Sequence, residues 1–343
     1  MSAHRIALLP GDGIGPEVVA AAVKVLQVVA PELQYDEFPV GAGEYLRGGD
    51  PLPPLVFERL REFDAILLGA MGLPGVRSPS GIEMTPQLDL RERLDLYCGL
   101  RPVYLFHPLD SPLREQTAGS IDVMLVREST EGLFAERRRQ PDTASGRVED
   151  TMRITRAGSE RVIRAAFRQA MLRRKRLALV DKANVLPSMA FFRQVFDQIA
   201  GEFPEVATDR VYVDAAALFF LQRPAMFDVI VTENMFGDIL SDLMAGLVGG
   251  MGMAPSADIG DRYAVFQPSH GSAPDIAGKG IANPAATILS AAMMLEWLGE
   301  SDAAARIQSA VRSVFSDRAA RTRDMGGSLS TSGMTAAIIA VLP

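Results

Sequence analysis

The 343-residue sequence has little of what several protein classes require. Its only cysteine, Cys98, cannot form an internal disulfide, which fits a reducing compartment. With three histidines and no histidine–cysteine cluster, a zinc or iron–sulfur site is disfavoured. No apolar run approaches the roughly 20 residues of a membrane span, and a Gly/Pro turn comes too early in the chain for a signal peptide. We therefore expect a cytoplasmic protein without a membrane partner.

Positive charge is not in excess either. The formal net charge is −7 at pH 7, which disfavours nucleic acid as a partner. A local basic pocket for a small anion remains compatible with this charge. The length suits two domains at the usual size of about 150 residues each.

Short apolar runs alternate with stretches of helical period along the chain. Nearly continuous apolar runs are typical of strands that are covered on both faces, so the pattern predicts an α/β fold with substantial parallel pairing. Helices are predicted at Val162–Met171 and Ala285–Leu298 from their spacing of apolar residues. The predicted strands are Arg5–Leu9, Ala65–Leu68, Ile121–Val126, Leu177–Val180, Val229–Val231 and Ala264–Phe266.

The stretch LLPGDGIGPE, residues 8–17, has glycines at three alternate positions after the first predicted strand. A dinucleotide-binding loop requires glycine also where Pro16 stands, so that the next helix can pack closely and direct its N–H groups at phosphate. Proline is well suited to the first turn of a helix. The stretch therefore predicts a strand, a turn and a helix, and it leaves open whether the turn is structural or binds a pyrophosphate.

Three aspartates are candidates for binding a metal ion. Asp238 and Asp242 are four positions apart, which places both carboxylates on one face of a helix, although a solvated face has the same spacing. Asp214 lies among apolar and small residues, a poor setting for an unpaired charge. If the three carboxylates converge, oxygen ligands favour Mg²⁺ or Mn²⁺ over zinc.

Four cations are candidates for the chemistry of an acidic substrate. Lys182 follows a predicted strand and is either a surface lysine or a group that transfers a proton. Arg91, Arg101 and Arg127 are either members of surface ion pairs or a set that binds the two carboxylates of a diacid.

A long loop rich in glycine, proline and alanine covers residues 270–284. Small residues let a flat ligand approach the backbone, and Asp275 could accept hydrogen bonds from ribose hydroxyls while repelling a 2′-phosphate. This composition favours NAD over NADP, with a tight structural loop as the alternative.

Together these stretches resemble the metal-dependent β-decarboxylating dehydrogenases, the family of isocitrate, isopropylmalate, homoisocitrate, tartrate and D-malate dehydrogenases. The resemblance covers essentially the whole chain and is closest to the isopropylmalate branch. The matching motifs, in order, are LLPGDGIGPEV, LDLRERLDLYCGLRP, LVRESTEG, VDKANVL, YVDAAA, TENMFGDILSDL, HGSAPDIAGKGIANPAATILSAAMMLE and GGSLSTSGMTAAI.

The resemblance implies a two-domain, isopropylmalate-dehydrogenase-like fold that is not a Rossmann fold. Residues 1–97 and 249–343 would form a discontinuous domain on the cofactor side, and residues 98–248 the domain for dimerisation, metal and substrate. An arm at about 135–152 would clasp a second subunit. The expected assembly is a homodimer with shared active sites.

The resemblance also implies roles for individual residues. Lys182 and Asp214 would be catalytic and serve the partner's cleft. Asp238 and Asp242 would hold Mg²⁺ or Mn²⁺ together with the partner subunit's Asp214. The resemblance also assigns the residues that bind the substrate and the cofactor. A small dicarboxylate 2-hydroxy acid would be bound by Leu88, Arg91, Arg101, Arg127 and Phe134. NAD would be bound by Ile14, His270, Gly271, Ala273, Asp275 and Asn283.

Two departures from the family pattern affect the chemistry. Phe134 stands where the family has a tyrosine that helps protonate the enol, and a phenyl ring has no proton to give. Leu88 favours a small or apolar C3 substituent, whereas Met84 and Gln87 differ from the usual isopropylmalate pattern. The expected reaction is NAD-dependent oxidative decarboxylation of a 3-substituted (R)-malate, with 3-isopropylmalate first. D-Malate or tartrate, and a catalytically weak regulatory homologue, are the alternatives.

Overall fold

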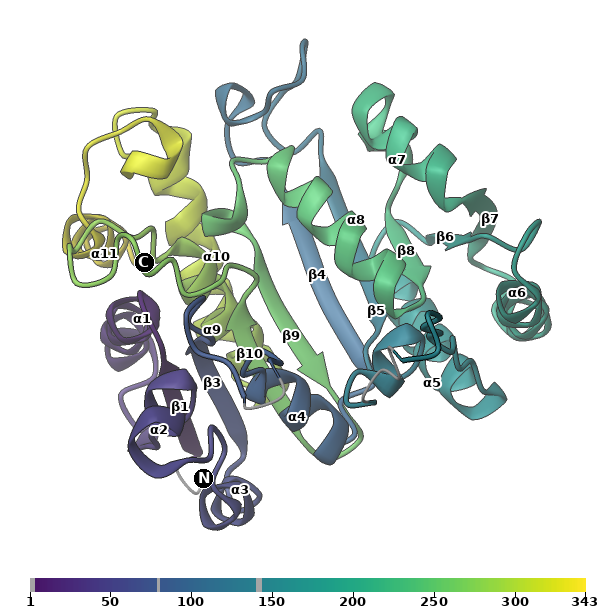
Figure 1. The fold of residues 1–343 in the computed structure, drawn as a ribbon. Coiled ribbons are helices and arrows are strands. Elements are labelled where there is room, and N and C mark those ends of the chain that lie inside the picture. The colour runs from purple at the N-terminus through teal and green to yellow at the C-terminus, as the bar shows by residue number, and fades with distance from the viewer. Residues whose placement is uncertain (1–3, 79–80, 140–143) are drawn as a thin grey trace.

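The computed structural model describes residues 4–78, 81–139 and 144–343. Its described strands form one ten-stranded mixed sheet in the order β2-β1-β3-β10-β9-β4-β5-β8-β6-β7, with helices on both faces (Figure 1). The predicted α/β class is confirmed. The strands are β1 (Arg5–Gly11), β2 (Gln34–Glu37), β3 (Ala65–Ala70), β4 (Cys98–Tyr104), β5 (Asp122–Glu128), β6 (Arg176–Asp181), β7 (Ala207–Tyr212), β8 (Val229–Thr232), β9 (Pro255–Ile259) and β10 (Ala264–Pro268).

The sheet has two halves that come from different parts of the chain. Strands β1, β2, β3, β9 and β10 lie on one side of the β9–β4 junction, and β4 to β8 lie on the other. Most neighbours are parallel, as predicted, but β9 is antiparallel to β10 and β4, and β4 is antiparallel to β5. The domain division predicted from the sequence falls at this junction and stays a prediction.

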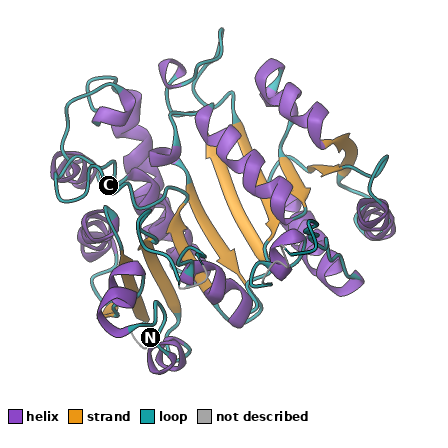
Figure 2. Cartoon of the chain, in the orientation of Figure 1, coloured by secondary structure: helices purple, strands orange, loops and turns teal. Residues whose placement is uncertain are grey.

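Two helical layers cover the sheet, as the secondary structure in Figure 2 shows. The predicted helix Val162–Met171 is the C-terminal part of α5, which starts earlier because the Thr155 side chain accepts a hydrogen bond from the Gly158 N–H at 3.0 Å. The helices are α1 (Gly15–Val29), α2 (Ala42–Gly48), α3 (Pro54–Leu60), α4 (Pro86–Arg93), α5 (Arg156–Met171), α6 (Pro187–Ala200), α7 (Val213–Gln222), α8 (Asn234–Gly246), α9 (Ala285–Trp297), α10 (Ser301–Ser316) and α11 (Thr331–Ala340).

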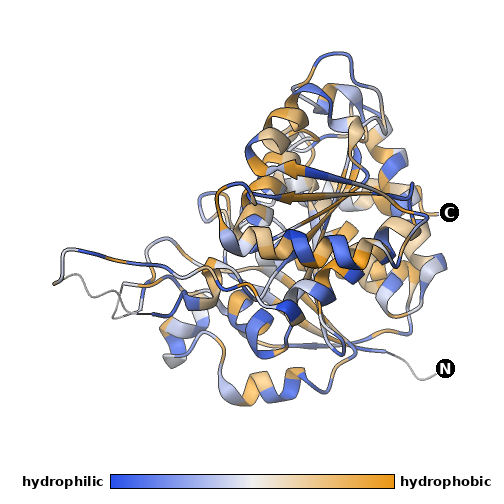
Figure 3. Cartoon of the chain, turned by 90° about the vertical axis from the view of Figure 1, so that its right-hand side faces the viewer, coloured by the Kyte–Doolittle hydropathy of each residue, from blue (hydrophilic) through white to orange (hydrophobic). Residues whose placement is uncertain are grey.

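The hydrophobic core lies on both faces of the sheet. Side chains from α1, α5, α6, α9, α10 and α11 pack with one face in a continuous cluster. Those from α3 and α4, and from α7 and α8, form separate clusters on the other face. Figure 3 shows hydrophobic colouring along the strands and much hydrophilic colouring on the outer turns of the helices. In Figure 1, α4 and α8 lie in front of the junction strands β4 and β9.

The glycine-rich turn after β1 packs against the loop of residues 270–284. Gly13 has a positive φ of 58°, and a Cβ there would lie 1.9 Å from the Ser272 carbonyl oxygen. The Ile14 N–H donates to that oxygen at 2.8 Å. The Asp12 carboxylate accepts hydrogen bonds at 2.8 Å from the N–H groups of residues 42, 43 and 72. The turn therefore has a structural role, because it ties four segments together.

The predicted arm of about 135–152 is described only in part. Residues 140–143 lie outside the described residues. At its base, a short 3₁₀ helix, η2 (Leu133–Glu136), is followed by Arg137 and Arg138, which both donate to the Asp89 carboxylate on α4. Clasping of a second subunit stays a prediction. No helix in the described part of the chain is long and apolar enough to cross a bilayer.

Candidate active site

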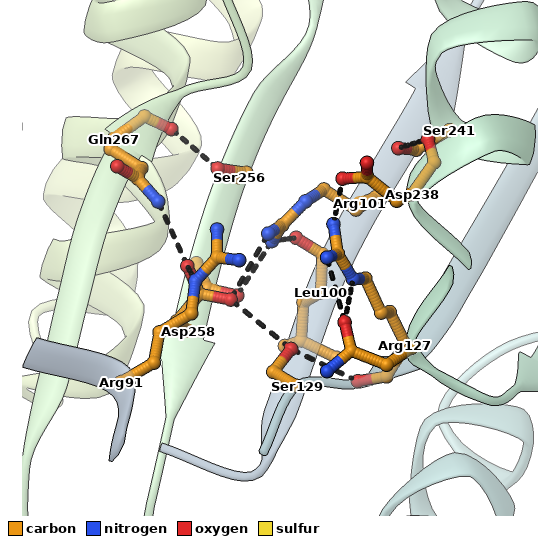
Figure 4. A network of polar contacts seen from close by, with 12 residues as sticks. Arg91, Leu100, Arg101, Arg127, Ser129, Asp238, Ser241, Ser256, Asp258 and Gln267 are labelled. Carbon is orange, nitrogen blue, oxygen red and sulfur yellow. Dashed lines mark hydrogen bonds and ion pairs between the residues drawn. The ribbon is translucent and has the colours of Figure 1, made fainter. Parts of the chain in front are cut away.

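Three arginines from three elements meet beside one aspartate at the β9–β4 junction (Figure 4). Arg91 on α4 donates through Nε to Asp258 Oδ2 at 2.9 Å, and Arg101 on β4 donates through Nη2 to Asp258 Oδ1 at 3.0 Å. The Asp258 side chain is fully buried. Arg127, on the neighbouring strand β5, completes the group and is itself 2% exposed. The structure thus collects three buried guanidinium groups at this junction, two of them bound to the Asp258 carboxylate.

The charged side chains of this group shift one another's pKa values. Burial alone would raise the pKa of Asp258, but the guanidinium groups of Arg101 and Arg91 lower it to about 2. Burial, followed by the charge of Arg91, lowers the pKa of Arg127 to about 10. Burial also lowers the pKa of Arg91. Because positive charges crowd together in a dry region, a second anion placed there would be stabilised.

Arg127 links the arginine group to helix α8. Its Nε and Nη2 donate to Asn234 Oδ1 at 3.0 and 2.7 Å, and its Nη1 donates to Asp238 Oδ1. The carbon of the guanidinium group lies 5.3 Å from the centre of the Phe134 ring. Phe134, which the resemblance places where the family has a tyrosine, is therefore next to a guanidinium group of the site.

The three arginines line a cavity of about 160 Å³, whereas Phe134 is not among the residues that line it. Asp238 and Asp242, one turn apart on α8, both face it. Burial raises the pKa of Asp242, and the charge of Asp238 raises it further. Two carboxylates that repel each other at an arginine-rich cavity are a suitable ligand pair for a hard divalent cation. The cavity is lined further by Gln87, Ser256, Gln267 and residues 68–71, 241 and 268–271.

Two buried polar atoms beside the cavity have no hydrogen-bond partner among the described residues: Gln87 Oε1 and His270 Nε2. Burial lowers the pKa of His270, so its imidazole is neutral near pH 7. Because its Nδ1–H donates to the Gly271 carbonyl oxygen at 3.0 Å, Nε2 carries no proton and can accept a hydrogen bond from a ligand. An unpaired buried polar atom costs stability until a ligand or water satisfies it. Both atoms therefore favour a polar ligand in this cavity.

Lys182 and Asp214 lie elsewhere in the chain, at the end of β6 and in the first turn of α7. Lys182 Nζ donates to Asp214 Oδ1 at 2.6 Å, and this hydrogen bond lowers the pKa of Asp214. Asp214 does not reach Asp238 and Asp242, and the described residues of one chain hold no group of three His, Cys, Asp or Glu side chains with metal-ligand geometry. A metal site completed by the partner subunit's Asp214 therefore stays a prediction.

Ile14 belongs to the turn after β1, and the other predicted cofactor residues belong to the loop of residues 270–284 beside the cavity. His270 and Gly271 line the cavity itself. Ile14 packs in a small apolar cluster that includes Ala273, and Asp275 is exposed. Asn283 is buried, and its Oδ1 accepts from the Ala285 N–H at 3.0 Å at the start of α9.

Comparison with known proteins supports what this geometry indicates. The family model described as isocitrate/isopropylmalate dehydrogenase matches residues 5–338. The chain belongs to the isocitrate/isopropylmalate dehydrogenase family. This membership confirms the predicted class of enzyme, a dehydrogenase of the β-decarboxylating type.

Individual relatives of this family are similar over nearly their whole length. A 3-isopropylmalate dehydrogenase of Moorella thermoacetica is 47% identical over 336 residues, which cover 94% of this chain and 93% of the relative. An isocitrate/homoisocitrate dehydrogenase of Thermus thermophilus is 46% identical and covers 99% of both chains. The crystal structure of isocitrate dehydrogenase from Methylococcus capsulatus superimposes with a TM-score of 0.88 at 40% identity, covering 99% of both chains.

Sequence reasoning missed the residue that organises the arginine group of this dehydrogenase. Asp258 lies in β9, a strand that was not predicted. It is far from Arg91 and Arg101 in the sequence, and no motif spacing relates it to them. The available signal was an aspartate between Ala257 and Ile259 in the segment PSADI, where an unpaired charge would be costly if the segment were buried. On α4, Gln87 lines the cavity, whereas Leu88 is half-buried and is not among the lining residues.

Proposed function

We propose that this dehydrogenase catalyses the NAD-dependent oxidative decarboxylation of a 3-substituted (R)-malate in the presence of Mg²⁺ or Mn²⁺, with 3-isopropylmalate as the first candidate substrate. The observation that carries the proposal is the group of three buried arginines beside the Asp238–Asp242 pair in one cavity. The 3-isopropylmalate dehydrogenase of Moorella thermoacetica, 47% identical, supports the choice of substrate.

Charge balance supports a dicarboxylate that binds together with a dication. The site has three guanidinium groups, Arg91, Arg101 and Arg127. Three carboxylates oppose them: Asp258 behind the arginines, and Asp238 and Asp242 at the cavity. A dianionic substrate and a divalent cation would bind without changing the net charge of the site, so the buried arginines would not be left with an uncompensated charge.

The metal would be held by Asp238 and Asp242, with the partner subunit's Asp214 as the proposed third ligand. Partial burial, followed by the charge of Asp238, raises the pKa of Asp242. A cation bound by the two carboxylates would offset both effects, so the donor set fits a hard ion. When bound, Mg²⁺ or Mn²⁺ supplies Lewis acidity to the oxygens of the substrate.

The loop of residues 270–284 would hold NAD. Gly271 lines the cavity, and a Cβ there would meet no atom within 4 Å, so the loop leaves open space in which a flat ligand can approach the backbone. Exposed Asp275 is free to accept hydrogen bonds from ribose hydroxyls, which favours NAD over NADP. NAD⁺ is the hydride acceptor in this chemistry.

The protein's own groups would bind, orient and move protons. Arg91 uses only Nε in binding Asp258, so its two terminal amino groups are available to a substrate carboxylate in a two-pronged hydrogen bond. The positive charge of Arg101 and Arg127 would stabilise negative charge that develops when carbon dioxide leaves. Lys182, in the partner's cleft, would take the hydroxyl proton. Phe134 cannot supply a proton, so we propose that another group or water protonates the enol carbon.

A second candidate substrate is a malate with a polar or absent C3 substituent, such as tartrate or D-malate. The unpartnered Gln87 Oε1 favours tartrate in particular, because a C3 hydroxyl can donate a hydrogen bond to that oxygen and an isopropyl group cannot. A catalytically weak regulatory homologue is the third possibility, suggested by Phe134.

An absorbance assay of NADH formation separates these possibilities. The purified protein is supplied with NAD⁺ and Mn²⁺ and with 3-isopropylmalate, D-malate, tartrate, isocitrate or homoisocitrate in turn. We expect the highest kcat/KM with 3-isopropylmalate, and preference for tartrate or D-malate would select the second candidate. No turnover on any of the five would contradict the proposed activity.

A further inference from the structure

A second cavity lies on the face of the sheet opposite the active site, and we call it the rear cavity. Its floor comes from β4, β5, β9 and β10, and its walls come from α5 on one side and from α9 and α10 on the other. Its volume is about 600 Å³, against about 160 Å³ for the active-site cavity. This volume is within the range of small-molecule sites, which is about 300–1,000 Å³.

The two cavities lie back to back through the same strands. On β4, Arg101 faces the active-site cavity, while its neighbours Leu100 and Pro102 face the rear cavity. On β10, Gln267 faces the active-site cavity and Phe266 faces the rear cavity. Successive side chains on a strand point to opposite faces. The rear cavity is therefore built by the central strands of the sheet rather than by loops at its edge.

The floor of the rear cavity is apolar, and the cavity is open to solvent. Tyr104 and Phe106 form an aromatic wall, with ring centres 4.9 Å apart in an edge-to-face arrangement. At the rim, Trp297 is 36% exposed and Leu172 is 81% exposed. Apolar surface that stays open to water in a concave region is a feature of ligand-binding grooves.

One cation of the rear cavity has no anionic partner among the described residues. The Arg312 guanidinium lies 4.8 Å above the centre of the Tyr104 ring and makes no hydrogen bond or ion pair within the described chain. Two other charged lining groups have partners: Arg173 binds Asp122 at 2.7 Å, and Glu296 accepts a hydrogen bond from Gln308 at 2.9 Å. A guanidinium that rests on an aromatic wall with free N–H groups is suited to a carboxylate whose body lies against the same wall.

We propose that the rear cavity binds a small molecule with one carboxylate and an apolar, aromatic or branched body. The body occupies the apolar floor, and the carboxylate binds the Arg312 guanidinium. This site uses none of the residues assigned to the proposed dehydrogenase chemistry, so the two proposals fail independently.

The test uses 8-anilinonaphthalene-1-sulfonate, an aromatic anion that becomes fluorescent in apolar sites. The full chain is titrated with saturating NAD⁺ and Mn²⁺ present, so that the dye cannot report a vacant dinucleotide site, and again without them. We expect saturable binding of one dye per chain under both conditions. Arg312→Gln should weaken it about tenfold, the loss of one charge-assisted interaction. Arg306→Gln should leave it unchanged, because that arginine is on the same helix but binds the Pro343 carbonyl oxygen.

Two further measurements keep the test independent of any single variant. Met293→Trp places a larger side chain in the cavity and should abolish dye binding, with circular dichroism as the check on folding. In the unmodified protein, 3-phenylpropanoate should displace the dye at least tenfold better than its uncharged amide. Dye binding that survives Met293→Trp in the folded protein, equal effects of Arg312→Gln and Arg306→Gln, or equal displacement by acid and amide would each overturn the proposal.

Discussion

Replacement of Asp258 by asparagine tests the electrostatic organisation of the active site most sharply. The asparagine keeps the size of the side chain and one oxygen acceptor, but it removes the charge that Arg91 and Arg101 share. Removing one partner of a buried ion pair costs about 3–5 kcal/mol, because the remaining charges stay buried. The retained hydrogen-bond acceptor places Asp258→Asn near the lower limit, so we expect a loss of about 3 kcal/mol in the free energy of unfolding.

The assay is urea unfolding, with Asp197→Asn as the matched control. Asp197 also binds an arginine, Arg210 at 2.6 Å, but its side chain is 48% exposed. An exposed pair of this kind contributes about 0–1 kcal/mol. We also expect malonate to raise the unfolding midpoint of Asp258→Asn more than that of the unmodified protein, since it supplies the missing negative charge.

The pH dependence gives a second measurement of the same carboxylate. The pKa of Asp258 is about 2 in the folded protein, below its ordinary value of 3.8. A lowered pKa contributes stability above pH 4 that is lost as the pH falls from about 4 to about 2, an effect of about 2 kcal/mol. Asp258→Asn should lack this part of the acid destabilisation. A variant as stable as Asp197→Asn, or no added effect of malonate, would refute the reasoning.

Three more predictions concern catalysis. Arg91→Gln should raise the KM for the substrate roughly 10- to 150-fold, because one charge-assisted hydrogen-bonding partner is lost. Arg93→Gln should leave KM unchanged, because Arg93 is on the same helix but stacks on the Phe57 ring. Similar KM values for both variants would exclude Arg91 from substrate binding. Phe134→Tyr should speed decarboxylation or enol protonation about tenfold or more while hydride transfer changes little, measured by rapid quench and stopped flow; equal acceleration of both steps would contradict this role. Inactive Lys182→Ala and Arg91→Ala chains, mixed and refolded together, should recover roughly a quarter of the activity. Half of the dimers would contain one chain of each kind, and each of these would have one intact shared site. No recovery would exclude shared sites.

Much of the fold could be predicted from local patterns because its central parallel strands are buried on both faces. Strands such as Ala65–Ala70 and Val229–Thr232 have only buried residues, so they are continuous apolar runs. The edge strands β2 and β7 are largely polar or exposed and have no such signal. Strands β4 and β9 were missed because each carries a charged residue, Arg101 and Asp258, within its buried run.

The candidate site could be predicted in its residue types but not in its pairing. Arg91, Arg101 and Arg127 were candidates from the sequence, and the structure brings them together. Their counter-ion could not be predicted, because Asp258 is 157 positions from Arg101 and the two meet only across the antiparallel β4–β9 pair. Local periodicity contains no information about such a tertiary contact. The proposed metal site with ligands from two chains could also not be predicted from local sequence patterns without the resemblance. Within one chain, Asp214 contacts Lys182 and not the other two aspartates.

The central claim is that this cavity couples oxidation of a hydroxy diacid to loss of carbon dioxide with a divalent cation. The most direct test follows NADH and labelled carbon dioxide together from 3-isopropylmalate carrying ¹³C in the carboxylate that leaves. We predict equal amounts of the two products, loss of both on treatment with EDTA, and recovery with Mg²⁺ or Mn²⁺. NADH formed without labelled carbon dioxide, or full turnover after thorough chelation, would contradict the account.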